Sequence, residues 1–315
     1  MIKMRFGIQT SINNVAWAEL ANMWRFLDRE TSFYSAWTFD HFIPPGADQD
    51  PAGSCFEGWS ALSALAAITE RIRIGCLVTG VTYREPAVLA KMAATVDHIS
   101  DGRLEFGIGA AWHELEHQMY GIPFPSVKER QDRLEEAVAI IRMLFDAESP
   151  VNFQGKHYKL RDAVFAPPCV QRPRPPIMIG GGGEKRTLRT LARYGDVMNV
   201  SGTPDAVKAK IDVLERHCRE FGRDPAEIEK TVFTPVIVSD NEKLIDRVAG
   251  MIAVGSGMTP DEAKRVSPIG SPAHVRQVIE RYADIGVTQI IMMAQAPWKR
   301  DIYERLNKEI VAPFA

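Results

Sequence analysis

The chain has 315 residues, of which 45% are hydrophobic, and its 38 Lys and Arg nearly balance 40 Asp and Glu to give a net charge of −2. This balance offers no electrostatic argument for a nucleic acid or an acidic membrane surface as a partner. The four cysteines lie far apart and form no Cys-x-x-Cys pair, which indicates free thiols in a reducing compartment. The N-terminus soon turns polar and no apolar run approaches the roughly 18 residues of a membrane helix. We therefore expect no secretory signal, no membrane span and a cytoplasmic location.

Short apolar runs alternate with amphipathic stretches of helical period along the first half of the chain. The runs predict strands at Phe6–Gln9, Ser35–Phe39, Arg71–Val78 and Leu104–Ile108. Helices are expected at 17–27, Trp59–Ala67, Pro86–Ile99 and Lys128–Phe145. The last of these has one apolar stripe and is otherwise mostly charged, as in a helix that covers a core.

The second half repeats this alternation. Strands are predicted at Ile177–Ile179, Val197–Val200, Thr231–Val238 and Gln289–Met293. Helices are predicted over 184–194, from Thr203-Pro204 to about residue 221, from Ser271-Pro272 onward and over 299–311. Eight strand-then-helix units predict a (β/α)8 barrel that spans 1–315 as one domain. An open doubly wound sheet is the alternative, although such sheets more often use fewer strands.

Two segments interrupt the alternation. Residues 146–176 contain an alternating stretch that turns at Gly155, which predicts a hairpin, and then a proline-rich connector. Residues 239–270 form a long excursion after the seventh strand. We expect both segments at loop positions, where barrels build active sites and lids.

Function in such a barrel is expected where strands end. Asp40 and His41 follow the second strand. His41 could bind a ligand, orient it or transfer a proton near neutral pH, and Asp40 could anchor a ligand or fix the imidazole ring. The alternative is that Asp40 caps a helix and His41 packs in a loop.

Residues after the third and fourth strands could contact a flat ligand. Cys76, Leu77 and the hydroxyl of Thr79 follow the third strand, although ordinary strand packing would also explain them. Arg84 and Glu85 come next and could bind a phosphate or form a surface ion pair. After the fourth strand, small residues permit close approach to the backbone and an aromatic pair could line a pocket; these are Gly109, Ala110, Trp112 and His113. A tight turn with a packed aromatic is the alternative there.

Four glycines follow the fifth strand and open a helix: Gly180, Gly181, Gly182 and Gly183. Glycine-rich backbone at a helix N-terminus can cradle an anion, because its N–H groups and the helix dipole point at the ligand. Lys185 and Arg186 add positive charge. The run matches neither a Walker motif nor a convincing dinucleotide fingerprint, and a flexible turn is the alternative.

Other chemistries lack their motifs. We find no His-Glu-x-x-His, no Cys/His cluster with metal-ligand spacing and no Gly-x-Ser-x-Gly elbow, so neither a metal site nor a hydrolase is indicated. The histidines in predicted helices and connectors are expected to be structural or on the surface; they are His98, His117, His157, His217 and His274.

Four strings in order resemble the luciferase-like monooxygenase superfamily, and within it the branch of coenzyme F420-dependent oxidoreductases. They are WTFDHF (37–42), LVTGVTYREPAVLAKMAATVDHISDGRLEFGIGAAW (77–112), ERQDRLEEA (129–137) and PPIMIGGGGEKRTL (175–188). The resemblance covers most of the chain and is thinnest after about residue 240.

The resemblance implies a barrel that binds a flavin or 5-deazaflavin at the C-terminal ends of its strands. Asp40 and His41 match the pair beside the ring, and Thr79 matches a residue that contacts it. Cys76-Leu77 matches the position of a non-prolyl cis peptide in relatives. The segment from Gly109 to His113 matches the loop against the ring and its ribityl chain, and Gly181, Gly182 and Gly183 match the phosphate site.

Two departures from the family pattern are visible. Ala111 replaces a glycine and His113 replaces an asparagine. Sugar-phosphate dehydrogenases of the superfamily place a glutamate acid where this chain has Ala110, which argues against that reaction.

These observations predict hydride transfer between a coenzyme and a small organic substrate, with His41 exchanging the proton, Asp40 orienting it and Trp112 forming a wall. The coenzyme is expected to be F420 rather than FMN; FMN would imply monooxygenation with O2 and a separate reductase. A flavin-binding protein without activity and a phosphate-binding aldolase or isomerase are the alternatives. The family suggests a homodimer, and the loops 42–58 and 239–270 are expected to select the substrate.

Overall fold

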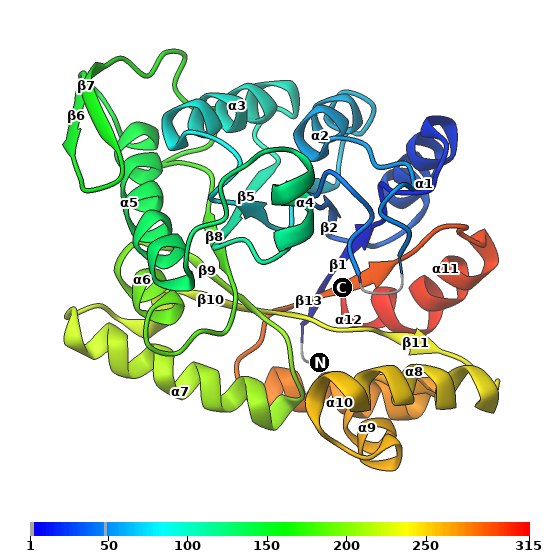
Figure 1. Ribbon diagram of the computed structural model, residues 1–315. Coiled ribbons are helices and arrows are strands. Elements are labelled where there is room, and N and C mark those ends of the chain that lie inside the picture. Colours follow the sequence, from blue (N-terminus) through cyan, green and yellow to red (C-terminus); the bar gives the residue numbers. More distant parts are fainter. Residues whose placement is uncertain (1–2, 47–48) are drawn as a thin grey trace.

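Eight parallel strands close into a barrel in the computed structural model, which describes residues 3–46 and 49–315 (Figure 1). They are β1 (Arg5–Thr10), β2 (Ser35–Thr38), β3 (Arg73–Cys76), β5 (Leu104–Gly109), β8 (Ile177–Gly180), β9 (Val197–Val200), β10 (Glu229–Phe233) and β13 (Gln289–Ala294). Because β13 pairs with β1 and β3 pairs with β5, the ring has no open edge. The predicted barrel is confirmed, and the open sheet is excluded.

The strands are buried on both faces, as parallel strands between a filled interior and a helical layer must be. Trp37, Leu77, Met178, Val197 and Ile291 form a buried cluster separate from the main core. Trp37 has no exposed surface, and its ring lies where a Cβ on Gly75 would be. The barrel is therefore a packed core rather than a pore, and ligands must bind at its rim.

Helices form the outer ring around the barrel (Figure 1). They are α1 (Trp17–Glu30), α2 (Gly58–Ala66), α3 (Pro86–Ile99), α5 (Val127–Phe145), α6 (Thr187–Tyr194), α7 (Pro204–Glu220), α10 (Pro272–Asp284), α11 (Arg300–Leu306) and α12 (Ala312–Phe314). A π-helical turn, Asn307–Val311, joins the last two, and a 3-10 turn, Pro225–Glu227, follows α7. The predicted starts at Thr203 and Ser271 are confirmed, because each side chain caps its helix by accepting a backbone N–H.

The two interrupting segments lie at different ends of the barrel. The first is the predicted hairpin, β6 (Val151–Gln154) and β7 (Lys159–Ala163), between α5 and β8. Its connector returns to the N-terminal end of the strands, where the Gln171 side chain donates to the carbonyl of Leu104 at 2.7 Å. The expectation that this segment lies among active-site loops was therefore wrong, because a helix-to-strand connection lies opposite the site.

The second segment follows β10 and lies at the functional end. The expected strand Thr231–Val238 is broken: β10 ends at Phe233, and β11 (Ile237–Val238) leaves the barrel to pair with β12 (Ile269–Gly270). Pro235 lies between them and has no N–H for a ladder. Between β11 and β12 lie α8 (Glu242–Ser256) and α9 (Pro260–Val266), which pack on a small core of their own; its buried members are Ile245, Ala249, Ala253, Ala263 and Ile269.

Within the described residues, no helix is both long enough and apolar enough to cross a membrane.

Candidate functional site

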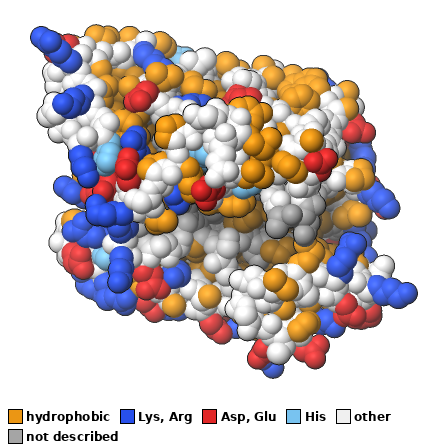
Figure 2. Space-filling model, viewed as in Figure 1, with side chains coloured by type: hydrophobic (Ala, Val, Ile, Leu, Met, Phe, Trp, Pro, Cys, Tyr) orange, Lys and Arg blue, Asp and Glu red, His pale blue; other side chains and the backbone are white. Residues whose placement is uncertain are grey.

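A cavity of about 610 Å³ opens at the C-terminal ends of the strands. The space-filling view shows this face of the molecule hollowed near its middle (Figure 2). The volume lies within the range of sites for small molecules and cofactors. Most predicted site residues line the cavity: Asp40, His41, Leu77, Thr79, Gly109, Ala110, Trp112, Gly180, Gly181, Gly182 and Gly183.

Two predicted site residues do not line it. Cys76 is wholly buried in β3, and burial raises the pKa of its thiol, so it is a packing residue. His113 is turned away from the cavity toward Glu116 on the short helix α4 (Glu114–Met119). The predicted contacts of both residues with the coenzyme stay predictions, although neither side chain lines the cavity.

The non-prolyl cis peptide is Leu77–Val78, one bond later than the expected Cys76–Leu77. The Gln9 side chain donates to the carbonyl of Leu77 at 2.8 Å. The Val78 side chain lies against two glycines on neighbouring strands. A Cβ at Gly109 or Gly180 would come within 2.9 or 2.8 Å of its Cγ2. These two glycines therefore make room for Val78, and not only for a ligand.

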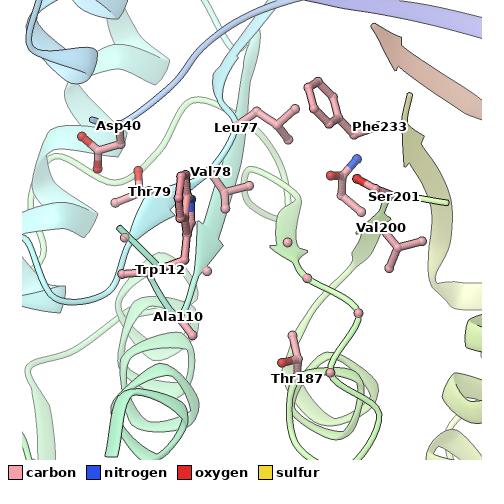
Figure 3. A pocket seen from close by; sticks show the side chains of 18 of the residues that line it. Asp40, Leu77, Val78, Thr79, Ala110, Trp112, Thr187, Val200, Ser201 and Phe233 are labelled. Carbon is pink, nitrogen blue, oxygen red and sulfur yellow. The ribbon is translucent and has the colours of Figure 1, made fainter. Parts of the chain in front are cut away.

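Two walls face each other across the cavity (Figure 3). Trp112 and Thr79 stand on one side, and Phe233 and Val200 stand on the other, with Leu77 at the inner end. Trp112 is 60% exposed, so the described residues leave most of its ring free at the mouth. A flat, largely apolar slot of this kind suits a planar ring system.

The glycine turn forms the far end of the cavity. Gly181 has φ +122°, a conformation that favours glycine, and leads the chain toward α6. The Thr187 hydroxyl donates to Gln131 on α5 at 3.2 Å, and both residues line the cavity. The N–H of Gly181 is donated to the carbonyl of Asn199 at 3.0 Å, so the backbone N–H groups of Gly182 and Gly183 ahead of α6 are the ones that could hold an anionic group.

Two basic side chains beside this turn, Arg186 and Lys210, are already paired. Arg186 bonds Asp132 on α5, and Lys210 on α7 lies 2.7 Å from Glu184. The expectation that Arg186 supplies free positive charge was wrong, because its charge is matched by a carboxylate. An anion at this turn could be held by backbone amides and by the exposed Lys185, which makes no ion pair with the described residues.

Asp40 and Arg84 form a buried ion pair at the other end. Two guanidinium nitrogens of Arg84 donate to the two oxygens of Asp40, at 2.6 and 3.0 Å. One of them also donates to Glu57 at 2.5 Å. Burial raises the pKa of Asp40, and the Arg84 charge opposes that rise. Arg84 is therefore neither a surface ion pair nor free to bind a phosphate.

The imidazole of His41 is held by Glu116 and not, as expected, by Asp40. Nδ1 of His41 lies 2.8 Å from Oε1 of Glu116, whereas the oxygens of Asp40 are taken by Arg84. The His41 ring meets Trp112 edge to face at 5.4 Å between centroids. His41 therefore lies between the cavity and α4.

The departure at Ala111 falls on an unusual backbone conformation. Its φ is +61°, in the left-handed region where alanine is disfavoured by about 1 kcal/mol or more and glycine is not. The glycine of the family pattern thus has a conformational reason, and this chain keeps the turn with a Cβ in place.

Other lining residues escaped the sequence analysis: Gln9, Tyr83, Gln131, Thr187, Asn199, Val200, Ser201 and Phe233. Most are single positions at the ends of strands or on helices, without a motif to mark them. Glu116 also escaped, although its spacing of three from His113 places both on one side of a helical turn. That spacing was the available signal.

The sequence profile of the family described as luciferase-like monooxygenase matches residues 4–266. The chain belongs to this family. Among its relatives, an F420-dependent glucose-6-phosphate dehydrogenase of Kineococcus radiotolerans is 28% identical over 339 positions, covering 98% of this chain and 96% of that protein. A pyrimidine monooxygenase RutA of Allorhizobium ampelinum is 29% identical over 176 positions, 53% of this chain and 46% of that protein.

A solved structure of an F420-dependent secondary alcohol dehydrogenase, in complex with an F420-acetone adduct, matches with a TM-score of 0.82. The match covers 98% of this chain and 99% of that chain at 22% identity, which shows a shared fold. Relatives of this luciferase-like monooxygenase family member thus include F420-dependent oxidoreductases and monooxygenases, which supports an enzyme of redox chemistry.

Proposed function

We propose that this protein is an oxidoreductase that moves a hydride between bound coenzyme F420 and a small organic substrate. The observation that carries the proposal is one continuous cavity that joins the titratable imidazole of His41 to the glycine turn before α6. The end-to-end similarity to an F420-dependent dehydrogenase favours the same coenzyme.

The residues present fit a coenzyme that has a planar ring and a phosphate. The backbone N–H groups of Gly182 and Gly183 would hold the phosphate, joined by the Thr187 hydroxyl once it turns from Gln131, and the slot beside Trp112 would hold the ring. When bound, F420 supplies two-electron hydride chemistry at its deazaflavin ring. The protein binds the coenzyme, orients it toward the substrate and excludes water from the site.

His41 would exchange a proton with the substrate at the nitrogen that Glu116 leaves free. A secondary alcohol, for example, must lose its hydroxyl proton as hydride leaves its carbon, and a ketone must gain one in reverse. None of the described residues that line the cavity is Lys or Arg, so we propose an uncharged substrate. An aldolase or isomerase that needs a lysine in its active site is also not supported, because no lysine is among the described lining residues.

The alternative coenzyme is FMN, with O2 as co-substrate and a separate reductase. The similarity to a pyrimidine monooxygenase supports it over about half of the chain. Deazaflavins react poorly with O2, so the two coenzymes imply different reactions. A homodimer and a cytoplasmic location stay predictions, and the loops 42–58 and 239–270 are proposed to select the substrate.

A titration of the purified protein with F420 and, separately, with FMN, followed by fluorescence, tests the proposal. We expect micromolar or tighter binding of F420 and weaker binding of FMN. Thr187→Val keeps the side-chain shape but removes the hydroxyl, so it should weaken F420 binding about tenfold, the loss of one good hydrogen bond. Thr95→Val is the matched control, because Thr95 is exposed on α3 and lines no part of the cavity.

The other outcomes each have a meaning. A preference for FMN would replace the proposal with a flavin monooxygenase. Tight F420 binding that no candidate alcohol or carbonyl compound reduces or oxidises would indicate a coenzyme-binding protein without activity. Binding of neither coenzyme would mean that the glycine turn serves another anion.

A further inference from the structure

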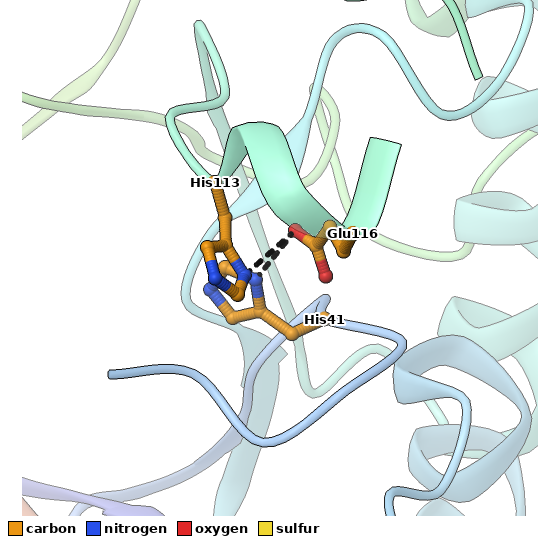
Figure 4. A group of neighbouring side chains, drawn as sticks. All are labelled: His41, His113 and Glu116. Atoms are coloured by element: carbon orange, nitrogen blue, oxygen red, sulfur yellow. Dashed lines mark hydrogen bonds and ion pairs between the residues drawn. The ribbon is translucent and has the colours of Figure 1, made fainter. Parts of the chain in front are cut away.

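Glu116 lies at the centre of a buried hydrogen-bond network beside the cavity. Its side chain comes from α4, has no exposed surface and reaches the loop after β2 (Figure 4). Oε2 accepts the backbone N–H of Phe42 at 2.9 Å. Oε1 accepts the hydroxyl of Tyr83 and lies 2.8 Å from Nδ1 of His41.

The charge states in this network follow from its donors. Burial alone would raise the pKa of Glu116, but hydrogen bonds from His41, Tyr83 and Phe42 hold it below its ordinary value. Burial and the Glu116 carboxylate raise the pKa of Tyr83, so its hydroxyl keeps its proton. An ionised carboxylate only accepts hydrogen bonds. The proton between Glu116 and His41 must therefore be carried by Nδ1 of the imidazole.

We infer that Glu116 is a positioning residue that fixes His41 in the tautomer with its proton on Nδ1, and so leaves Nε2 to exchange a proton with the substrate. In the described part of the chain, no hydrogen bond engages Nε2 of His41. Phe39 and Trp112 flank the ring at 5.6 and 5.4 Å between centroids, which limits its rotation. The inference deepens the proposed function. Only the statement that Nε2 exchanges a proton with the substrate rests on that proposed function.

Several other titratable groups face His41. From α4, Nδ1 of His113 lies 3.7 Å from Oε1 of Glu116, and burial lowers the pKa of His113, which favours its neutral form. His117 is bonded to Thr82 and to the carbonyl of His113. The charge of Asp40 is paired with that of Arg84. Burial raises the pKa of the Cys55 thiol to about 12, and this thiol donates to the carbonyl of His41. Glu116 is thus the negative charge closest to the ring that lacks a cationic partner of its own.

The same side chains could instead bind a metal ion, which is the main alternative to the hydrogen-bond network. Single ligand atoms of His41, His113 and Glu116 lie within 4.8 Å of one another, a two-histidine, one-carboxylate set. However, the 2.8 Å between Nδ1 and Oε1 is a hydrogen-bond distance. Two atoms bound tetrahedrally to one ion at about 2.1 Å lie about 3.4 Å apart. An ion would also displace the proton and compete with the bonds from Phe42 and Tyr83.

The test is a long-range proton–nitrogen NMR spectrum of the coenzyme-free protein labelled with ¹⁵N-histidine, with His41→Gln to assign the signals. We expect neutral His41 to carry its proton on Nδ1. Glu116→Gln removes the charge and replaces one carboxylate oxygen with an NH2 group that can donate to an unprotonated Nδ1, so the Nδ1 preference should weaken and a population with the proton on Nε2 should appear. Glu114→Gln is the matched control, because it removes a charge from the exposed side of the same helix and should leave the tautomer unchanged.

Tyr83→Phe provides a second variant if Glu116→Gln does not fold. It removes one competing donor to Oε1, so the hydrogen bond from Nδ1 of His41 should strengthen and the Nδ1 proton signal should move downfield. A proton on Nε2 in the unaltered protein, a tautomer and an Nδ1 signal unchanged in both variants, or stoichiometric binding of added Zn²⁺ that shifts both His41 and His113 would each overturn the inference. Because coenzyme is absent from these measurements, their failure is separate from a failure of the coenzyme titration.

Discussion

The ion pair of Asp40 and Arg84 shows how a residue that looks catalytic can be committed to structure. Asp40 has no exposed side-chain surface and Arg84 has 12%, and their charges meet through two hydrogen bonds. A buried charge that loses its partner is costly, whereas replacing both partners with apolar groups is often nearly neutral. The pair therefore allows a test that separates structure from catalysis.

Replacing Arg84 alone, as Arg84→Met, should lower the free energy of unfolding by about 3–5 kcal/mol, because Asp40 is left buried and unpaired. The double variant Asp40→Leu with Arg84→Met should lose clearly less than the sum of the single changes. Urea unfolding curves measure both. The exposed pair Arg29–Glu70, at 3.9 Å, is the control, and Arg29→Met should change stability by less than about 1 kcal/mol. Additive losses at Asp40 and Arg84 would contradict the coupling.

Single residues differ in how far the sequence could predict them. Asp40, His41, Trp112 and the glycine turn directly follow recognisable apolar strands, so their place at the rim could be predicted. The partner of His41 could not, because Glu116 is 75 positions away and meets it only when α4 folds over the rim. The cis bond was predicted one position early. A family resemblance identifies the segment that contains such a bond, but the exact bond could be assigned only from the structure.

Among the elements, all eight barrel strands could be located because each is a short apolar run followed by an amphipathic helix. The exception is the end of β10. The run from Thr231 to Val238 is mostly apolar, but Pro235 interrupts its hydrogen-bond ladder, and β11 pairs with β12 instead. Hydropathy alone cannot tell a continuous strand from two strands with different partners.

Helix α8 contains glycines whose effects should be opposite. Gly250 lies inside the helix, and a Cβ there would meet nothing within 4 Å. Gly250→Ala should stabilise α8 by up to about 1 kcal/mol, because glycine is a poor helix former. Gly257 ends the helix with φ +73°, so Gly257→Ala should destabilise it. Hydrogen exchange of the α8 amides should slow in the first variant and quicken in the second; a change of the same sign in both would contradict this assignment of the helix end.

At the scale of the molecule, the two ends of the barrel have different tasks. Ion pairs close the N-terminal end, where Arg5 bonds Glu229 and Arg73 lies 2.9 Å from Glu105. The cavity occupies the C-terminal end. Stability and chemistry are thus separated along the barrel axis, as in other barrels of this type, and buried carboxylates away from the site contribute to stability.

Asp28 is such a carboxylate. It is 4% exposed and accepts the backbone N–H groups of Glu70, Arg71 and Ile72 at 2.8 to 2.9 Å, which ties α1 to the segment that leads into β3. Burial alone would raise its pKa, but these three donors bring it below the ordinary 3.8. A pKa lowered by folding adds stability that is complete above the unfolded-state pKa and is lost as pH falls through the folded one.

Asp28→Asn should therefore be less stable than the unaltered protein by about 1–3 kcal/mol at neutral pH. The difference should shrink as pH falls below about 4, because the unaltered protein then loses the same charge. Urea unfolding across this pH range measures it. Asp284→Asn, at an exposed position near the end of α10, should show no such convergence, and a difference at Asp28 that is constant with pH would mean that charge is not its source.

The separate core beneath α8 and α9 has a consequence for how this chain could have changed over generations. These helices pack on Ile245, Ala249, Ala253, Ala263 and Ile269 rather than on the main core. A substitution within that small core is therefore expected to leave the packing of the barrel strands unchanged. Selection can thus act on the folding of α8 and α9 separately from the barrel, although both lie in the stretch 4–266 that the family profile matches.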